Sequence, residues 1–228
     1  NEEYFLQVDS HTYFEENWDE NLIIQYKTLL GKSSKPIIST YPYGFSIEEN
    51  NEITFKKPSG KTVLLLRPKK ELKIDKQNLV LQFRAKHITS SEAILGCHIA
   101  AGFLFAKGSF IEEIPYDPYL YFHGEEQSLA IRSFTKGWDI YHPKWIPLYH
   151  LYKKAGTKYE NHHWSGDISK QRDFDWVYLQ KRAKDRLQEL IYGKLNSSVY
   201  GLGKDRTIDE YIKFSGIDYF NYTITDSI

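Results

Sequence analysis

Apolar and polar positions follow two periods along this chain, one typical of strands and one typical of helices. Short apolar runs bounded by polar residues predict strands, because alternate side chains of a strand face opposite sides. These strands are expected at residues 4–8, 35–41, 79–83 and 96–106, with shorter extended segments at 138–141 and 146–152. Apolar residues at helical spacing predict helices. The helices are expected between His11 and Gly31, and at residues 109–114, 125–134, 173–192 and 206–212.

The stretch from residue 45 to residue 78 has a weaker pattern. Two short runs, at 52–55 and 63–66, are typical of strands, and Lys57–Gly60 between them contains the Pro and Gly of a turn. We therefore expect a hairpin there. Because the stretch offers no candidate chemistry, we interpret 45–78 as a surface insertion in a single domain spanning residues 1–228.

Composition excludes few classes of function, but it limits the kinds of binding partner to expect. The 228 residues are enough for one sizeable domain, and 30 basic residues balance 30 acidic ones. A net charge of zero gives no electrostatic reason to expect nucleic acid or an anionic membrane as partner. No apolar run is long enough to span a bilayer. Cys97 is the single cysteine, which fits a reducing compartment, so we expect a cytoplasmic protein.

The aromatic content of 16% is high. Proteins stack sugars and bases on aromatic faces, although an aromatic core would give the same composition.

The first predicted strand, at 4–8, is expected to be buried and central in its sheet, and it ends in a pair of candidate metal ligands. Asp9 and His11 follow the run at 4–8. Residues i and i+2 of an extended chain point to the same side, so both side chains can face one ion. A carboxylate oxygen and an imidazole nitrogen suit a divalent ion such as Mn²⁺, Mg²⁺ or Zn²⁺. The alternative is an Asp that caps the next helix beside a surface His.

Three further groups of residues are candidates, each with a structural alternative. Ala101 and Gly102 are small enough for close backbone approach, or for tight packing between elements. Glu125 and Glu126 open a predicted helix, where carboxylates favour the helix dipole, or where one of them faces a cleft. His150 lies near the end of an apolar run, where a lone His is more often structural than a ligand.

Several short blocks occur in a fixed order along the chain. The blocks are Gln7–His11 with Glu16–Asp19, Ala100–Phe103, Glu113–Pro118, Gly124–Glu126, the run that carries His150, Tyr200–Gly203 with Arg206–Thr207, and Phe214–Asp218. Together they resemble one glycosyltransferase family, the family typified by the Skp1-hydroxyproline N-acetylglucosaminyltransferase. The resemblance covers nearly the whole chain apart from about 45–78. The triplet Asp9-Ser10-His11 is also similar to the metal-binding motif of the mucin-type polypeptide N-acetylgalactosaminyltransferases.

This resemblance implies an α/β domain of the GT-A type, a mixed central sheet flanked by helices. It implies a divalent metal, Mn²⁺ with Mg²⁺ as the alternative, held by Asp9, His11 and His150. Glu125 and Glu126 are then the catalytic candidates. The implied reaction is the transfer of N-acetylglucosamine, with retention, from a UDP-sugar to a hydroxyl of a protein or glycan acceptor.

The resemblance gives a less direct indication of which residues contact the sugar donor. Asp9, Ser10, Ala101 and Gly102 are expected beside the donor. The polar segment 153–167 is expected to be a mobile loop, whose His162, His163 and Trp164 would close over the donor diphosphate. An idle exposed loop is the alternative.

One departure from the family concerns the start of the sequence. A GT-A domain has its first nucleotide-binding strands before the Asp-x-His strand, and three residues precede Tyr4 here. The resemblance therefore implies either a sequence that lacks the N-terminal nucleotide-binding strands or an incomplete uridine pocket.

Two other functions compete with sugar transfer. A non-catalytic carbohydrate-binding domain would use the aromatic side chains without metal. A metal-dependent hydrolase would use Asp9, His11 and His150 without a nucleotide sugar.

Overall fold

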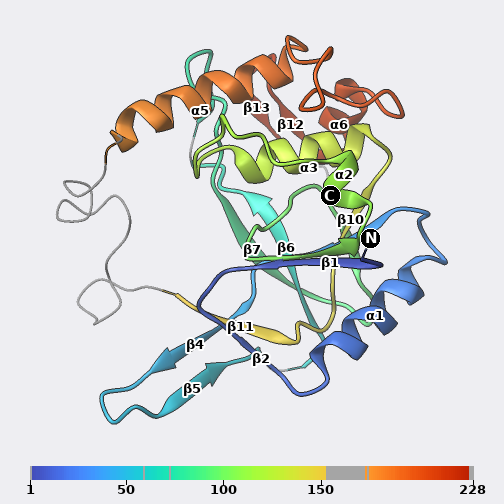
Figure 1. Cartoon of the computed structure of the whole chain (residues 1–228), viewed down its shortest axis with the longest axis vertical. Helices are drawn as coiled ribbons and strands as arrows, with labels where there is room; N and C mark the ends of the chain where they lie inside the picture. Colours follow the sequence, from blue (N-terminus) through green and yellow to red (C-terminus); the bar gives the residue numbers. More distant parts are fainter. Residues whose placement is uncertain (1, 59, 72, 153–172, 174, 226–228) are drawn as a thin grey trace.

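The computed structural model describes residues 2–58, 60–71, 73–152, 173 and 175–225. A five-stranded mixed sheet runs through the middle of the molecule (Figure 1). Its strands, in spatial order, are β1 (Tyr4–Val8), β9 (Phe103–Lys107), β3 (Pro36–Ser39), β10 (Asp139–His142) and β8 (Ile94–Gly96). Strands β3 and β10 are parallel, and the other pairs are antiparallel. The expected mixed α/β class is confirmed.

Helices cover both faces of this sheet. Helix α1 (Trp18–Leu29) packs on one face, where Leu22 and Tyr26 join a core with Ile38 of β3. Helices α2 (Phe110–Glu113) and α3 (Glu125–Thr135) pack on the other face, where Ile37 of β3 joins their core. Because adjacent strand residues point to opposite sides, a strand buried on both faces is apolar at consecutive positions, as β3 is.

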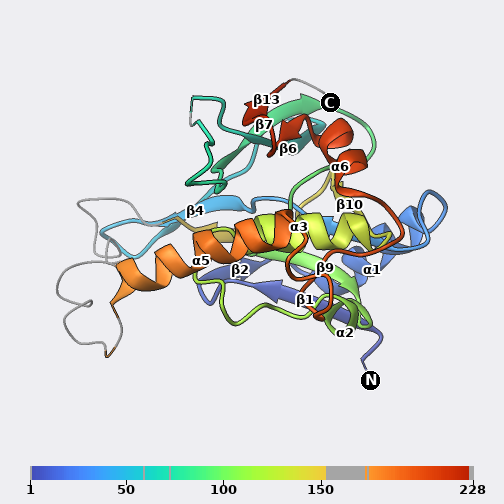
Figure 2. The same ribbon diagram turned by 90° about the horizontal axis from the view of Figure 1, so that it is seen from above.

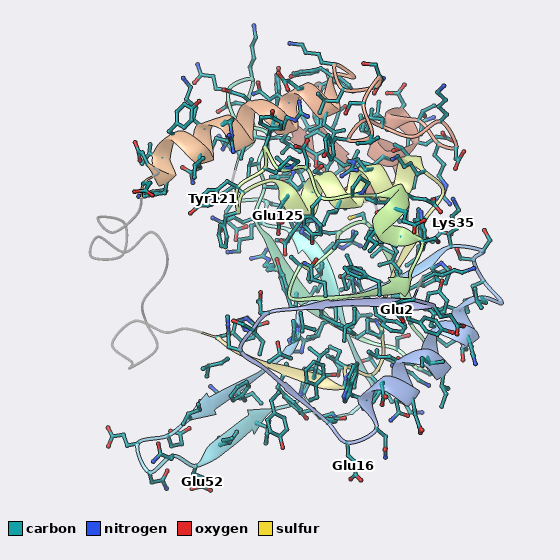
Figure 3. The ribbon with its side chains drawn as sticks, viewed as in Figure 1. Glu2, Glu16, Lys35, Glu52, Tyr121 and Glu125 are labelled. Carbon is teal, nitrogen blue, oxygen red and sulfur yellow. The ribbon has the colours of Figure 1, made fainter. Side chains whose placement is uncertain are left out.

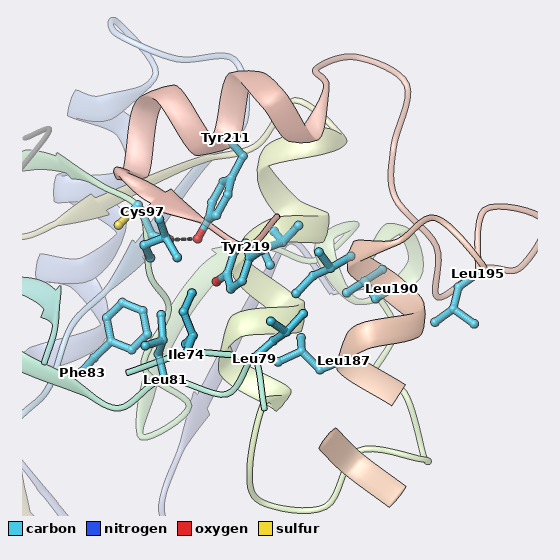
Figure 4. Packing of buried hydrophobic residues seen from close by; sticks show 13 residues of the cluster. Ile74, Leu79, Leu81, Phe83, Cys97, Leu187, Leu190, Leu195, Tyr211 and Tyr219 are labelled. Atoms are coloured by element: carbon cyan, nitrogen blue, oxygen red, sulfur yellow. Dashed lines mark hydrogen bonds between the residues drawn. The ribbon is translucent and has the colours of Figure 1, made fainter. Parts of the chain in front are cut away.

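The C-terminal elements extend the α3 side of the fold. Helix α5 (Trp176–Ile191) runs alongside α3, as Figure 2 shows from above. Helix α6 (Ile208–Ser215) begins at Thr207 with a capping box, and β12 (Ile217–Asp218) pairs with β13 (Thr223–Ile224). The expected helices at 173–192 and 206–212 are confirmed. In the core below α6, the hydroxyl of Tyr211 donates to the carbonyl oxygen of Cys97 at 2.8 Å (Figure 4).

A second sheet lies below the first in Figure 1. Its four strands, in order, are β2 (Thr12–Phe14), β11 (Leu148–Leu151), β4 (Tyr43–Ile47) and β5 (Ile53–Lys56). Strand β11 is antiparallel to β2 and parallel to β4. A further pair, β6 (Thr62–Pro68) with β7 (Phe83–Thr89), is antiparallel.

The hairpin expected around Lys57–Gly60 is wrong. Strand β5 pairs with β4 through the polar turn at 48–51, and β6 pairs with β7. The stretch 45–78 is also not uniformly at the surface. All four residues of β5 are exposed, whereas Val63–Leu66 of β6 are at most 5% exposed. That this stretch is an insertion stays a prediction.

Three other expected elements differ from the structure. The run at 96–106 is broken, since β8 ends at Gly96 and β9 begins at Phe103. Residues 79–82 form no strand, although Leu79 and Leu81 are buried. After His11 the chain first forms β2 and only then α1.

Strand β1, expected to be buried and central, is half-buried and lies at the edge of the sheet, where β9 is its neighbour among the described strands. Its apolar residues still reach the core, because Tyr4, Leu6 and Val8 all pack against the buried cluster that includes residues of α1. An apolar run thus indicates that a strand packs against the core but not the position of that strand within its sheet.

No helix among the described residues is long and apolar enough to cross a membrane.

The break between β8 and β9 is held by one buried hydroxyl. Ser39 Oγ donates to the carbonyl oxygen of Phe103 at 2.7 Å and accepts from the Ala100 amide at 2.9 Å. Ser39→Ala removes this hydroxyl from both the Phe103 carbonyl oxygen and the Ala100 amide. An unpaired buried polar group costs about 1–3 kcal/mol. We expect urea denaturation to show a free energy of unfolding lower by about 2 kcal/mol. Ser46→Ala, at an exposed hydrogen bond, is the matched control and should change it little. Equal midpoints for both variants would contradict this role.

Candidate functional site

The turn after β1 and the end of β11 meet at one point. In the β2–β11 ladder His150 lies opposite Thr12, and the Leu151 amide donates to the His11 carbonyl oxygen at 3.0 Å. This register places the imidazoles of His11 and His150 with ring centroids 4.4 Å apart. The turn itself is fixed by Thr12 Oγ1, which donates to the Asp9 carbonyl oxygen at 2.8 Å.

Asp9, His11 and His150 form one compact group. Each offers a ligand atom, and these atoms lie within 4.8 Å of one another. His150 Nε2 is 2.8 Å from Asp9 Oδ2. The His150 side chain is 12% exposed and that of Asp9 is 47% exposed, so the group opens to solvent on the carboxylate side. A Cβ at position 102 would lie 3.1 Å from Asp9 Oδ2, so Gly102 leaves room for this carboxylate.

A cavity of about 540 Å³ lies beside this group. It is bordered by Asp9, by Ala101 and Gly102 in the break between β8 and β9, and by Glu125 and Glu126 at the start of α3. Figure 3 shows Glu125 at the start of α3, on the side facing β1. The structure therefore brings five of the sequence-predicted site residues to one cavity.

Backbone geometry and hydrogen bonds hold the two glutamates in place. The chain enters α3 through Gly124, whose φ of 81° lies in the left-handed region that favours glycine. Glu126 Oε1 then accepts from the Ala101 amide at 2.8 Å. The other backbone polar group of Ala101, its carbonyl oxygen, accepts from Gln7 Nε2 of β1 at 2.9 Å. Residue 101 thus ties the start of α3 to β1.

The environment changes the acid–base behaviour of Glu125. Burial, followed by the negative charges of Glu126 and Asp9, raises the pKa of Glu125 from 4.5 to about 7. At neutral pH this carboxyl group is therefore distributed between its protonated and ionised forms. Such a group can both donate and accept a proton, which is the requirement for general acid–base catalysis at this pH.

Aromatic side chains border the site. Tyr41 and Phe122 line the cavity, and the Phe122 side chain is 55% exposed. Tyr152 packs against His150 with ring centroids 4.4 Å apart, and its hydroxyl donates to the Pro42 carbonyl oxygen at 2.9 Å. Burial raises the pKa of the Tyr41 and Tyr152 hydroxyls above the usual range, so both stay protonated hydrogen-bond donors.

The other predicted donor-side residues either do not line the cavity or lie outside the residues that the structure describes. Ser10 is exposed, and its hydroxyl is 3.4 Å from His11 Nδ1. His162, His163 and Trp164, with the whole segment 153–167, lie outside the described residues.

Sequence reasoning missed several residues that line the cavity, among them Gln7, Tyr41, His98 and Gln127. Gln7 precedes Asp9 and His11 at the same i, i+2 spacing, and this spacing in the sequence is a usable signal. The other three carry no local pattern that separates them from core residues.

The family model described as Glycosyltransferase (GlcNAc) matches residues 1–221. The chain belongs to this glycosyltransferase family. The match spans Asp9, His11, His150 and both glutamates, so the cavity lies within the region that the family shares. The family confirms the expectation of a glycosyltransferase with a sugar donor and an acceptor. None of the curated proteins searched matches the chain significantly.

The residues of the cluster in this glycosyltransferase fit a divalent metal. One carboxylate and two imidazoles are ligands that Mn²⁺ and related ions accept, and three protein ligands leave further coordination positions open. The Nδ1 atom of His150 is buried and has no hydrogen-bond partner among the described residues, so the Nε2 atom facing Asp9 carries the polar contacts of this ring.

Metal binding can be measured directly. We expect Mn²⁺ to bind to the purified chain in calorimetry, and EDTA to remove it. His11→Ala and His150→Ala should each weaken this binding by at least about tenfold, because losing an outer-shell partner of a ligand already costs that much and each variant loses a ligand itself. His87→Ala, at an exposed histidine of β7, is the control and should bind as the wild type does. Unchanged affinity in both cluster variants would exclude this site.

The raised pKa of Glu125 also has a consequence for stability. Between pH 4.5 and about 7, the unfolded chain releases this proton while the folded protein retains it. The cost to folding therefore grows as the pH rises through this window and is fully present above it. Glu125→Gln removes that cost. In EDTA, its stability relative to wild type should rise across the window by on the order of 3 kcal/mol. Glu49→Gln, at an exposed turn, is the control. A difference that is constant with pH would contradict the raised pKa.

Proposed function

We propose that this glycosyltransferase transfers N-acetylglucosamine from UDP-N-acetylglucosamine to an acceptor hydroxyl in a metal-dependent reaction. One observation carries the proposal. Asp9 belongs both to the cluster with His11 and His150 and to the wall of the cavity that holds Glu125 and Glu126. Groups suited to a metal–diphosphate and groups suited to proton transfer therefore adjoin one another.

The chemistry of sugar transfer explains why these groups are needed together. Breaking the bond between sugar and nucleotide leaves a diphosphate with additional negative charge. A divalent cation, when bound, neutralises that charge. Asp9, His11 and His150 would hold the cation. Ala101 and Gly102 let the donor approach the backbone closely, and Ser10 lies in the same turn as the cluster.

The glutamates act on the sugar side in this proposal. Glu125, with its pKa near 7, can accept or donate a proton at neutral pH. Glu126, held by the Ala101 amide, can orient the donor sugar or the acceptor hydroxyl, or support positive charge that develops on the sugar. We propose a retaining outcome on the basis of the family resemblance.

The acceptor is proposed to be a hydroxyl on a protein or a glycan, as in the Skp1-hydroxyproline enzymes that the sequence resembles. Exposed aromatic side chains such as Phe122 at the cavity supply faces on which a sugar or an acceptor can stack. His162, His163 and Trp164 remain proposed donor-side residues of the segment 153–167. A cytoplasmic location remains part of the proposal and is supported by the single buried thiol of Cys97.

Incubation with Mn²⁺ and a panel of UDP-sugars tests the proposal. We expect UDP release with UDP-N-acetylglucosamine and none in EDTA. Glu125→Gln and Glu126→Gln should each lower kcat by about a hundredfold, while donor affinity changes little, because each group acts mainly in the transition state. Glu49→Gln should keep full turnover.

Other results would support the rival functions. Glycan binding in EDTA without UDP release with any donor would indicate a carbohydrate-binding domain. Cleavage of a phosphoester or glycoside without a nucleotide sugar would indicate a hydrolase.

A further inference from the structure

One wall of the cavity contains a buried histidine that the proposed reaction does not yet use. His98 lies in the break between β8 and β9 and is 1% exposed. Its ring stacks on Phe83 of β7, with centroids 3.4 Å apart and planes inclined by 3°. A flat ring packed this closely has a fixed orientation, because rotation about the bond to Cβ would drive it into Phe83.

The polar atoms of this ring have few partners. Neither nitrogen of His98 forms a hydrogen bond of normal geometry with a described residue. Nε2 lies 3.5 Å from Glu126 Oε2, which is within ion-pair range. Burying an imidazole without a full complement of hydrogen bonds is unfavourable. A purely structural role would be served better by an apolar ring of the same shape, since the Phe83 stack needs no nitrogen.

Glu126 is consequently contacted on both oxygens. Oε1 accepts from the Ala101 amide at 2.8 Å, and Oε2 faces His98 Nε2. The amide belongs to a backbone segment anchored by Gln7 and by Ser39. These two contacts approach the carboxylate from the same break between β8 and β9, so together they fix its rotation about its last side-chain bond.

We infer that His98 is a positioning residue, whose Nε2–H orients the Glu126 carboxylate toward the cavity while Phe83 fixes the imidazole. The inference deepens the proposed function and rests on it, because orientation of Glu126 matters for turnover only if Glu126 acts in sugar transfer. Contact between the two side chains does not depend on that function and can be tested separately.

Two variants separate the nitrogen from the ring. His98→Phe keeps an aromatic ring against Phe83 and removes both nitrogens. His98→Gln removes the ring and returns a side-chain N–H donor. We expect His98→Phe to lower kcat by about tenfold and to leave the donor KM within about twofold, because orientation is lost while binding groups remain. His98→Gln should recover part of that kcat. Thermal unfolding followed by circular dichroism shows whether each variant folds.

A double variant tests whether His98 acts through Glu126. If it does, adding His98→Phe to Glu126→Gln should lower kcat by less than twofold beyond Glu126→Gln alone. Multiplied effects of the two substitutions would overturn the inference, and so would a His98→Phe variant with wild-type kcat.

The contact itself can be read without metal or donor. In long-range ¹H–¹⁵N spectra, Glu126→Gln should shift the His98 Nε2 resonance. This resonance is assigned by comparison with His98→Gln, whose spectrum lacks it. The resonances of the exposed His87 should not move. An unmoved His98 resonance would overturn the inference even if the variants are inactive. If the wild type releases no UDP from any donor, the proposed function fails, and the spectra still decide whether His98 holds Glu126.

Discussion

The candidate site depends on the pairing of β11 between β2 and β4. Asp9 and His11 come from one turn, but His150 is brought beside them by a ladder in which it lies opposite Thr12 on one side and Gly44 on the other. A shift of one residue in this register would turn the His150 side chain to the other face of the sheet. The cluster is therefore specified by backbone pairing between distant segments, and the hydrogen bond from the Leu151 amide to the His11 carbonyl oxygen extends that pairing to the turn.

The cavity beside the cluster concentrates negative charge. Asp9, Glu125 and Glu126 border the same space, and burial, together with the repulsion between these carboxylates, raises the pKa of Glu125. An arrangement of this kind lowers the stability of the fold. It is retained where the chemistry needs a shifted pKa, which is why groups with shifted pKa values are found so often at functional sites. A divalent cation in the cluster would offset the charge of Asp9 and, through it, part of the repulsion felt by both glutamates.

Elements with local signals could be predicted from the sequence, and those that depend on distant partners could not. Helix α6 follows from Thr207 and its capping box, since both interactions lie within one turn of helix. The sequence pattern favours the wrong hairpin because two turn signals compete. The turn at 48–51 closes it with Asn51 at a φ of 64°, a conformation that Asn tolerates, although the Pro and Gly of Lys57–Gly60 give the stronger local pattern.

The same limit applies to the site. The spacing of Asp9 and His11 is visible in the sequence, whereas only the family resemblance points to His150, and no sequence pattern points to His98. His98 and His142 are both buried histidines in apolar surroundings. His142 Nδ1–H donates to the Ser39 carbonyl oxygen at 2.6 Å, and burial lowers its pKa to about 4, as suits a neutral structural residue. His98 instead faces a carboxylate that arrives from α3. Two equally buried histidines thus differ in the partner that the fold supplies, and the sequence around each histidine does not contain that partner.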